Sequence, residues 1–391
     1  MNALLTRLLG RMPIGWLQLV HNKSRLAVAL AGVAFANVLV FVQLGMLGAL
    51  TATTVQPYSM IVGDIIISAS DSNTLADGGN VARQHMLRAL AMPGVVDAAP
   101  VFIGNIDWQV DDARSSIVQV MALPSDAADF VASEIRQQFR HLALPATALI
   151  DIGTRGGSPE LFEAISLTTP VTYELNNRQV AFVGTIDVGA GFSADGNAMM
   201  SDQTFLHLFA KRSSAAPDHL VLRVADGVSV ARVVELLHQM LPTDTLKIRS
   251  FADAVADDQS YQTTERPVGV IFGLGTIVGI LVGIVIVYQV LSTDVADHLK
   301  EYATFKAMGY GQPFFLGIIF EEAIILAIFG FIPGALVATG IYQLLAAKSG
   351  LPVDMTAARA IVVFFGTLAA CSISGAIATR RLARADPADL F

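Results

Sequence analysis

The sequence has little charge and almost no cysteine. Charged residues make up 15% of its 391 residues, well below the roughly 25% of an ordinary soluble domain. The single cysteine, Cys371, excludes a disulfide within the chain, so every folded part must be stabilised by its own apolar core. The net charge of −8 argues against a nucleic-acid partner.

Catalytic and metal-binding motifs are also missing from the sequence. The histidines are scattered, with no H-E-x-x-H pattern or close ligand pair, so we expect no metal site. The stretch "DIGTRGGSPELF" (151–162) lacks the lysine of a P-loop and is predicted to be a loop. The glycine-rich stretch 184–202 lacks the alternating acids and closing glutamate of a calcium loop, and it is also predicted to be a loop. We therefore expect a non-catalytic chain that binds no cofactor of its own.

Long apolar runs replace the missing charge. Hydrophobic residues make up 53% of the chain and the mean hydropathy is +0.58. A membrane helix needs about 20 mostly apolar residues, and four runs are long enough. The first run is predicted to be an uncleaved span, since no small-residue cleavage site follows it. The predicted transmembrane helices are residues 26–51, 267–292, 313–345 and 359–379.

Basic residues near the span ends predict the orientation of the chain. Arg7, Arg11, Lys23 and Arg25 precede the first run, and Arg380, Arg381 and Arg384 follow the fourth. We therefore expect a multi-pass protein of a bacterial inner membrane with both termini in the cytoplasm. Residues 1–25 are predicted to include an interfacial helix, and residues 380–391 to form a cytoplasmic tail. Residues 52–266 and the loop 346–358 are expected on the periplasmic side.

The segment 52–266 has the pattern of a folded α+β domain. Strand–helix–strand patterns near its two ends predict two βαβ-like units, which form a base of residues 60–102 and 216–252. The alternating segments between them predict a β-rich insert, residues 103–215. The predicted fold class is a membrane α-helical protein with four transmembrane helices and a large α+β periplasmic domain.

Small and polar residues recur inside the predicted spans. Small residues allow close helix packing in lipid, and we expect it at Gly269, Gly273, Gly275, Gly279, Gly283, Gly330 and Gly334. Asn37 and Gln43 are expected to make interhelical hydrogen bonds. Glu321 and Glu322 lie about 12 Å into the third span, with no basic residue expected beside them at that depth. Such carboxylates are costly in lipid and point to a function, unless the helix begins later and they lie near the interface.

A charged segment, "STDVADHLKEYATFKAMGYG" (292–311), separates the second and third spans. We predict an amphipathic helix at 293–309, with Thr293 as its N-cap and Gly309 as its C-terminal stop. Val295, Leu299 and Tyr302 share its apolar arc. Helices on an anionic membrane surface prefer basic polar faces. This one is acidic on balance, which favours a groove on a protein partner.

The core of this segment, "EYATFKAMG" (301–309), matches the signature E-(I/Y)-(G/A)-x-x-(K/R)-A-x-G of one permease group. That signature precedes the third span in the MacB/FtsX/LolC superfamily of ABC transporter permeases, which the chain resembles in its layout of spans. Glu322-Ala323 matches a further motif of that superfamily. The first span, the charged segment and the final "ADPADLF" are similar to the DevC-type permeases.

The resemblance implies a type VII permease that forms a homodimer and binds a separate pair of cytoplasmic ABC ATPase subunits. ATP and magnesium would belong to those subunits, since the sequence has no Walker A motif. It also implies a periplasmic membrane-fusion protein, a TolC-like duct and export of an amphiphile such as a glycolipid, lipid or drug. An FtsX-like subunit that activates a periplasmic cell-wall hydrolase is the alternative, and a stand-alone membrane enzyme is a third possibility that the missing catalytic set disfavours. The implied ATPase-coupling residues are Val295, Leu299, Glu301, Tyr302, Phe305, Lys306 and Gly309.

Overall fold

The computed structural model describes residues 14–111, 114–298, 301, 304–306 and 308–383. Its internal contacts divide the chain into two units. The helical unit comprises residues 1–48, 270–345 and 353–391. The globular unit comprises residues 49–269 and 346–352, so most of it is one long insertion between two helices.

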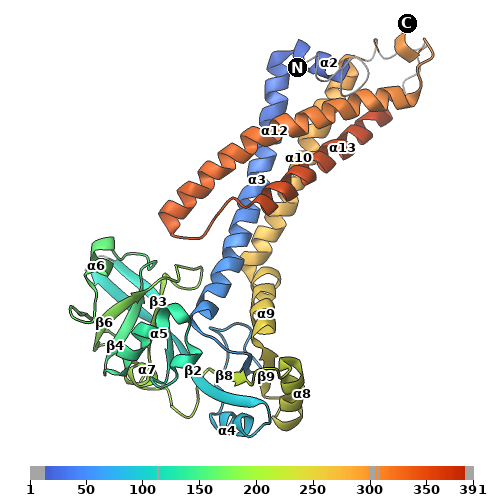
Figure 1. Cartoon of the computed structure of the whole chain (residues 1–391). Coiled ribbons are helices and arrows are strands. Elements are labelled where there is room, and N and C mark those ends of the chain that lie inside the picture. The colour runs from blue at the N-terminus through green and yellow to red at the C-terminus, as the bar shows by residue number, and fades with distance from the viewer. Residues whose placement is uncertain (1–13, 112–113, 299–300, 302–303, 307, 384–391) are drawn as a thin grey trace. The chain divides into compact units, whose positions relative to one another are not determined.

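Long apolar helices make up the helical unit (Figure 1). Four helices of the described chain are long and apolar enough to cross a membrane, which confirms the four predicted spans. All four run past at least one predicted end, because a helix does not stop where the bilayer does. The helices are α2 (Ile14–His21), α3 (Lys23–Val55), α10 (Pro267–Asp297), α12 (Gln312–Ser349) and α13 (Ala357–Ala383).

Glycines of two helices let α3 pack closely on both α10 and α12. A Cβ added at Gly279 of α10 would lie 3.0 Å from the Val40 side chain of α3. A Cβ added at Gly334 of α12 would lie 2.9 Å from the Cβ of Asn37. Any larger side chain at these positions would push the helices apart, as close packing in lipid requires small residues. Gly275, Gly283 and Gly330 make similar contacts with Gln43, Ala36 and Val33.

Gly269 and Gly273, which were expected to pack in the same way, do not join this seam. A Cβ at Gly269 would meet the backbone of the preceding turn at Gln262 and Thr263. A Cβ at Gly273 would meet no described atom within 4 Å. The reason is helical phase, since positions 273 and 275 are about 200° apart around the helix axis. Gly269 and Gly273 therefore lie on a different face of α10 from the glycines that pack against α3.

The base of the globular unit is a four-stranded antiparallel sheet in the order β2-β8-β1-β9. Helices α4 (Gln84–Leu90) and α8 (Val230–Met240) cover one face, where Ile65, Ile67 and Leu237 belong to one apolar core. The segments β1-α4-β2 and β8-α8-β9 are the two predicted βαβ-like units, and together they give a ferredoxin-like arrangement. The strands are β1 (Ile65–Ala69), β2 (Val95–Asp111), β8 (His219–Val224) and β9 (Leu246–Ser250).

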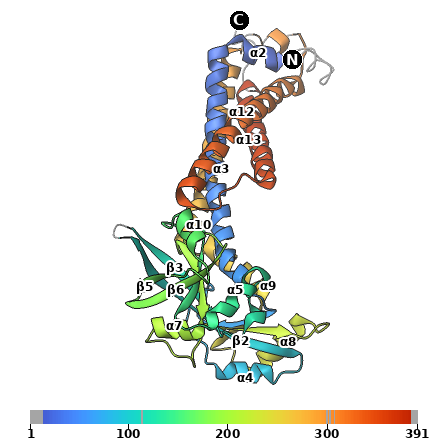
Figure 2. The same cartoon turned by 60° about the vertical axis from the view of Figure 1, so that its left-hand side comes forward.

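The second half of β2 enters a six-stranded β-barrel, of which Figure 2 labels strands β2, β3, β5 and β6. The barrel runs β2-β3-β7-β4-β6-β5 and closes where Trp108 of β2 pairs with Leu175 of β5. Closure leaves no exposed strand edge. Buried side chains including Trp108, Phe102 and Phe182 fill its core. The other barrel strands are β3 (Arg114–Leu123), β4 (Thr147–Asp151), β5 (Val171–Leu175), β6 (Arg178–Ile186) and β7 (Gly196–Ser201).

The barrel confirms the predicted β-rich insert and corrects one detail. The glycine-rich stretch 184–202 is not all loop, because its end forms β7 between β3 and β4. Every residue of β7 is buried, so "GNAMMS" lacks the polar alternation that identifies a half-exposed strand. The sequence pattern therefore could not reveal it.

Serine residues begin several short helices of the globular unit. The side chains of Ser158, Ser201 and Ser250 accept backbone N–H groups in the first turns of α6, α7 and α9, as helix N-caps do. The Ser250 cap begins α9, the helix that leads directly into α10. The remaining elements are η1 (Gln56–Met60), η2 (Ala128–Phe130), α5 (Ser133–Phe139), η3 (Arg140–Ala143), α6 (Pro159–Ala164), α7 (Asp202–Leu208) and α9 (Phe251–Thr264).

Candidate functional site

The charged segment begins as a continuation of α10. This helix extends to Asp297, and Thr293 lies inside it with its hydroxyl donating to the carbonyl of Gln289 at 2.8 Å. The prediction that Thr293 is an N-cap is therefore wrong. No glycine or proline stands between Tyr288 and Asp297 to end the helix. Leu299 and Tyr302, two of the predicted coupling residues, lie outside the described residues.

The other end of the segment is a turn centred on Gly309. Its φ of +94° is the left-handed conformation that favours glycine. The N–H of Tyr310 donates to the carbonyl of Phe305, and the N–H of Gly309 donates to the carbonyl of Lys306, both at 3.1 Å. These two bonds form a Schellman motif, which ends a helix at a fixed residue. The predicted role of Gly309 as a helix stop is confirmed.

Aromatic contacts attach this turn to the start of α12. The rings of Phe305 and Tyr310 meet edge to face at 5.8 Å, the apolar contact that often accompanies a Schellman motif. Tyr310 also lies 4.5 Å from Phe314, and Phe305 packs against the core of the helical unit. The turn is therefore a shaped part of the helical unit.

Burial divides the predicted coupling residues into two groups. Val295 is 1% exposed and packs in the helical core with Phe315 and Ile318, so it is not available to a partner. Its helical position was read correctly, but its side chain is buried in the core that α10 shares with α3, α12 and α13. Met308, which the sequence did not single out, is 60% exposed. Between residues 301 and 310, the exposed residues that the structure describes are Glu301, Thr304, Lys306, Met308, Gly309 and Tyr310, which we call the exposed turn.

An ion-pair cluster at the end of α10 lies next to this turn in the chain. Arg25, at the start of α3, bonds to Asp297 at 2.6 Å and lies 3.5 Å from Asp294. Asp294 is only 3% exposed, whereas the Asp297 side chain is 60% exposed. Removing one partner of a buried charge pair leaves an uncompensated charge. Arg25 therefore ties the first turn of α3 to the last turn of α10.

Glu321 and Glu322 are buried where α2 meets α12. The backbone N–H of Trp16 donates to Glu321 at 3.2 Å, so this carboxylate occupies the N-terminal turn of α2, where helix N–H groups lack internal partners. Glu322 is fully buried and interacts electrostatically with Asp294 and Arg25. Arg25 lies just before the predicted first span, so it does not contradict the expectation that no basic residue of another span pairs with these carboxylates. Arg25 escaped notice because it precedes the first apolar run.

The two polar residues of α3 lie in its contacts with other helices. Asn37 pairs with Thr367 of α13, with 2.5 Å between its Oδ1 and the threonine Oγ1. This is the interhelical hydrogen bond that the sequence predicts. Gln43 lies against Gly275 of α10, where a Cβ would come within 2.5 Å of it.

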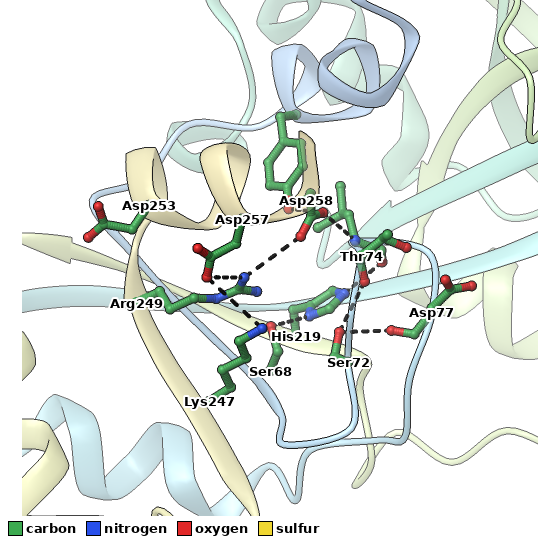
Figure 3. A network of polar contacts seen from close by, with 12 residues as sticks. Ser68, Ser72, Thr74, Asp77, His219, Lys247, Arg249, Asp253, Asp257 and Asp258 are labelled. Carbon is green, nitrogen blue, oxygen red and sulfur yellow. Dashed lines mark hydrogen bonds and ion pairs between the residues drawn. The ribbon is translucent and has the colours of Figure 1, made fainter. Parts of the chain in front are cut away.

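The globular unit contains a second polar site, which Figure 3 shows. Asp258 of α9 accepts a hydrogen bond from the Tyr58 hydroxyl at 2.5 Å and from the backbone N–H of Leu75 at 2.7 Å. Arg249 of β9 lies 3.7 Å from the same carboxylate. His219 of β8 bonds to the carbonyl of Leu75 at 2.7 Å. Both backbone polar groups of Leu75 are thus held by buried side chains.

Burial sets the protonation of this site. It raises the pKa of Asp258 and lowers the pKa of His219, because a charged form loses hydration in the interior. Since the His219 Nε2 faces the Leu75 carbonyl, it carries the proton, and the Ser68 hydroxyl donates to Nδ1 at 2.8 Å. His219 is 2% exposed, so it presents no base to a substrate. No group of three or more described His, Cys, Asp or Glu residues could hold a metal ion.

The stretch "DIGTRGG" (151–157) stabilises neighbouring loops through the side chains of Asp151 and Arg155. Asp151 accepts the backbone N–H groups of Gly153, Val188 and Gly189 at 2.8 to 3.0 Å, which fixes the loop after β6. Arg155 pairs with Asp195 at 2.9 Å and donates to the carbonyl of Ser349. Ser349 is the last residue of α12 and lies in the 346–352 segment of the globular unit. An arginine suits the unpaired carbonyls of a helix C-terminus.

Residues 273–387 match the family model of the FtsX-like permease C-terminal domain. This part of the chain is therefore an FtsX-like permease C-terminal domain. The match begins within α10 and contains the exposed turn, Glu321 and Glu322. It makes the chain a permease-type subunit.

Two solved structures are similar to about half of this chain. The periplasmic region of MacB from Actinobacillus actinomycetemcomitans aligns with 54% of this chain and 97% of its own, at 12% identity and a TM-score of 0.35. The extracellular domain of the noncanonic ABC-type transporter YknZ from Gram-positive bacteria aligns with 48% of this chain and 98% of its own, at 8% identity and a TM-score of 0.33. No curated protein matches the sequence.

Proposed function

We propose that this chain is the permease subunit of an ABC exporter. A separate pair of cytoplasmic ATPase subunits binds the exposed turn on each copy of a homodimer. ATP hydrolysis moves the helices, and the globular unit on the periplasmic side works with a membrane-fusion protein and a TolC-like duct. The cargo is an amphiphile such as a glycolipid, lipid or drug.

The exposed turn is the observation that carries this proposal. It combines two exposed charges, Glu301 and Lys306, with an exposed apolar side chain, Met308. Its shape is fixed by the Schellman motif and by the packing of Phe305. A preformed turn loses little conformational freedom on binding, so more of its contact energy contributes to affinity. The acidic charges around it suit a protein groove better than an anionic lipid surface.

The orientation rests on the basic residues near the ends of the spans. They support a cytoplasmic location for the exposed turn and both termini, with the globular unit on the other side. ATP is a cytoplasmic substrate, so this orientation brings the turn to the side on which an ATPase acts.

Affinity capture of the tagged full-length chain tests the proposal. We expect an ABC ATPase to copurify, and we expect Lys306→Glu and Met308→Asp each to reduce both the captured ATPase and its ATP hydrolysis severalfold. Lys348→Glu is the matched control, because Lys348 is exposed at the opposite end of α12 and should change neither. ATPase capture that is equal for all variants would overturn the coupling role. Capture of a cell-wall hydrolase without a fusion protein would favour the signalling alternative.

A further inference from the structure

An apolar cavity of about 180 Å³ opens between α3, α10 and α13 inside the helical unit. Small residues make the room, and its wall includes Ala36, Gly279, Gly283, Gly366 and Ala370. An apolar cavity of about 150 Å³ is large enough to bind benzene. This cavity can therefore hold part of an alkyl chain.

The cavity opens toward the outer surface of the helical unit. Val362 of α13 and Ile280 of α10 belong to its wall and are 63% and 43% exposed. Exposed apolar side chains on a membrane span face lipid. A ligand can therefore enter from the bilayer between α10 and α13.

One polar side chain interrupts the apolar wall. Asn37 is 4% exposed and lines the cavity, and its Nδ2 has no hydrogen-bond partner among the described residues. Thr367 lies 2.5 Å from Asn37 Oδ1 and 2.8 Å from the Val363 carbonyl, but its hydroxyl has only one proton to donate. One end of the Asn37 amide therefore lacks a partner in either orientation, and an unpaired polar group in an apolar site favours a ligand that can pair with it.

The depth of Asn37 limits which ligand can do so. Asn37 stands 11 residues after Leu26, which follows the last basic residue of α3, and 13 before Leu50, after which threonines interrupt the apolar run. At 1.5 Å per residue these distances are about 17 and 20 Å, so Asn37 lies near the middle of the hydrocarbon. The ester groups of ordinary phospholipids lie at the edge of that layer. A bulk lipid tail would fill the cavity and leave the amide unpaired.

We propose that this cavity binds an amphiphile whose alkyl chain has a hydroxyl near its middle. The alkyl segment fills the apolar wall, and the hydroxyl pairs with Asn37, since it can both donate and accept. A second copy of the chain is a poorer occupant. The amide is buried among helices of one chain, and a neighbouring helix about 10 Å across does not fit the cavity. Binding in this cavity needs no ATPase. The cavity proposal can therefore fail while the proposed function stands, and the proposed function can fail while the cavity proposal stands.

Binding of a matched pair of fatty acids tests the proposal. The full-length protein, in nanodiscs of dioleoyl phosphatidylcholine, is titrated with radiolabelled 12-hydroxyoctadecanoic acid and octadecanoic acid. We expect the hydroxy acid to bind about tenfold more tightly, as one additional satisfied hydrogen bond predicts. Asn37→Leu should reduce this ratio to about one while octadecanoic acid still binds. Ala370→Leu should weaken both acids by filling the cavity.

The control is Ser374→Ala, which lies on α13 like Ala370 but outside the cavity. Its hydroxyl donates to the Ile284 carbonyl, and its loss should leave the preference for the hydroxy acid unchanged. Equal binding of the two acids by the unmodified chain would overturn the proposal. A preference that survives Asn37→Leu would do the same. A change in the oligomeric state of the Asn37→Leu chain would also overturn it, because the amide would then serve a second copy.

Discussion

The hydroxyl of Tyr58 donates a 2.5 Å hydrogen bond to the carboxylate of Asp258, a residue 200 positions further along the chain. Tyr58 belongs to the turn η1 that follows α3, and Asp258 belongs to α9, which leads into α10. The bond therefore joins the segment that enters the globular unit to the segment that leaves it. Since Asp258 also holds the N–H of Leu75, one carboxylate connects three separate parts of the unit.

Loss of the Tyr58 hydroxyl should weaken the globular unit. Asp258 is fully buried, so Tyr58→Phe leaves it short of a donor and should lower the free energy of unfolding by about 1–3 kcal/mol. The measurement is denaturant unfolding in a Trp16→Phe background, where the buried Trp108 is the only tryptophan. Tyr261→Phe, at a partly exposed position of α9, should cost much less. Equal losses for the two variants would contradict the role of this bond.

His219 should make the stability of the globular unit depend on pH. Its pKa is lowered from 6.5 by burial, so the unfolded chain binds a proton that the folded chain resists. The free energy of unfolding should therefore decrease as the pH falls below about 6.5. Asp258, whose pKa is raised, has the opposite sign, and its contribution is lost as the pH rises through that raised value.

The His219 contribution is the difference between the unmodified chain and His219→Gln, with Asp258 present in both. Trp108 fluorescence during denaturant unfolding at pH 7.5, 6.5 and 5.5 provides the measurement. The unmodified chain should lose more stability than the variant between pH 6.5 and 5.5. Parallel pH profiles would show that His219 is not the group responsible.

The glycine seam between α3 and α10 should tolerate no large side chain. A Cβ at Gly279 would already lie 3.0 Å from the Val40 side chain, so Gly279→Leu should force the helices apart at a cost of about 1–3 kcal/mol or more. Gly273→Leu, on the same helix but with no described atom within 4 Å of its Cβ, should cost far less. Thermal stability of the detergent-solubilised chain, followed by size-exclusion chromatography, compares them. Equal melting of the two variants would refute the packing.

Attachment of α2 to α12 should depend on Glu321 and on the small size of Gly15. Glu321→Ala removes the acceptor of the Trp16 N–H, and Gly15→Val places a side chain 2.9 Å from the Ile318 carbonyl. Both changes should speed amide hydrogen exchange in residues 14–21 at least tenfold. Leu17→Ala alters a side chain that is 44% exposed and serves as the control. Unchanged exchange in the first two variants would exclude this attachment.

Sequence periodicity was enough to predict the elements that have one dominant environment. The four spans are long apolar runs, and the strands Ile65–Ala69 and His219–Val224 lie within the predicted base, residues 60–102 and 216–252. Gly309 was predictable because few residues other than glycine adopt its backbone conformation. The fully buried strand Gly196–Ser201 was not, since burial on both faces removes the alternation that identifies a strand.

The candidate sites were predicted less well, because they depend on contacts between distant residues. The spacing put Val295 on an apolar face, but it could not show that this side chain is buried in the core of the helical unit. Arg25 stands outside the first apolar run, yet folding brings it to Asp294 and Asp297. The network around Asp258 joins residues from four separate segments, none with a local motif. Only the folded chain reveals such sites.

The meeting of Tyr58 with Asp258 has a consequence for the history of such proteins. An inserted domain whose two ends are adjacent can be replaced without changing the separation of the elements that flank it. The transmembrane helices of a permease can therefore stay unchanged while the domain inserted between them is replaced by a domain that binds other partners. The junction residues, Tyr58 on one side and Asp258 on the other, are where such an exchange would need to match.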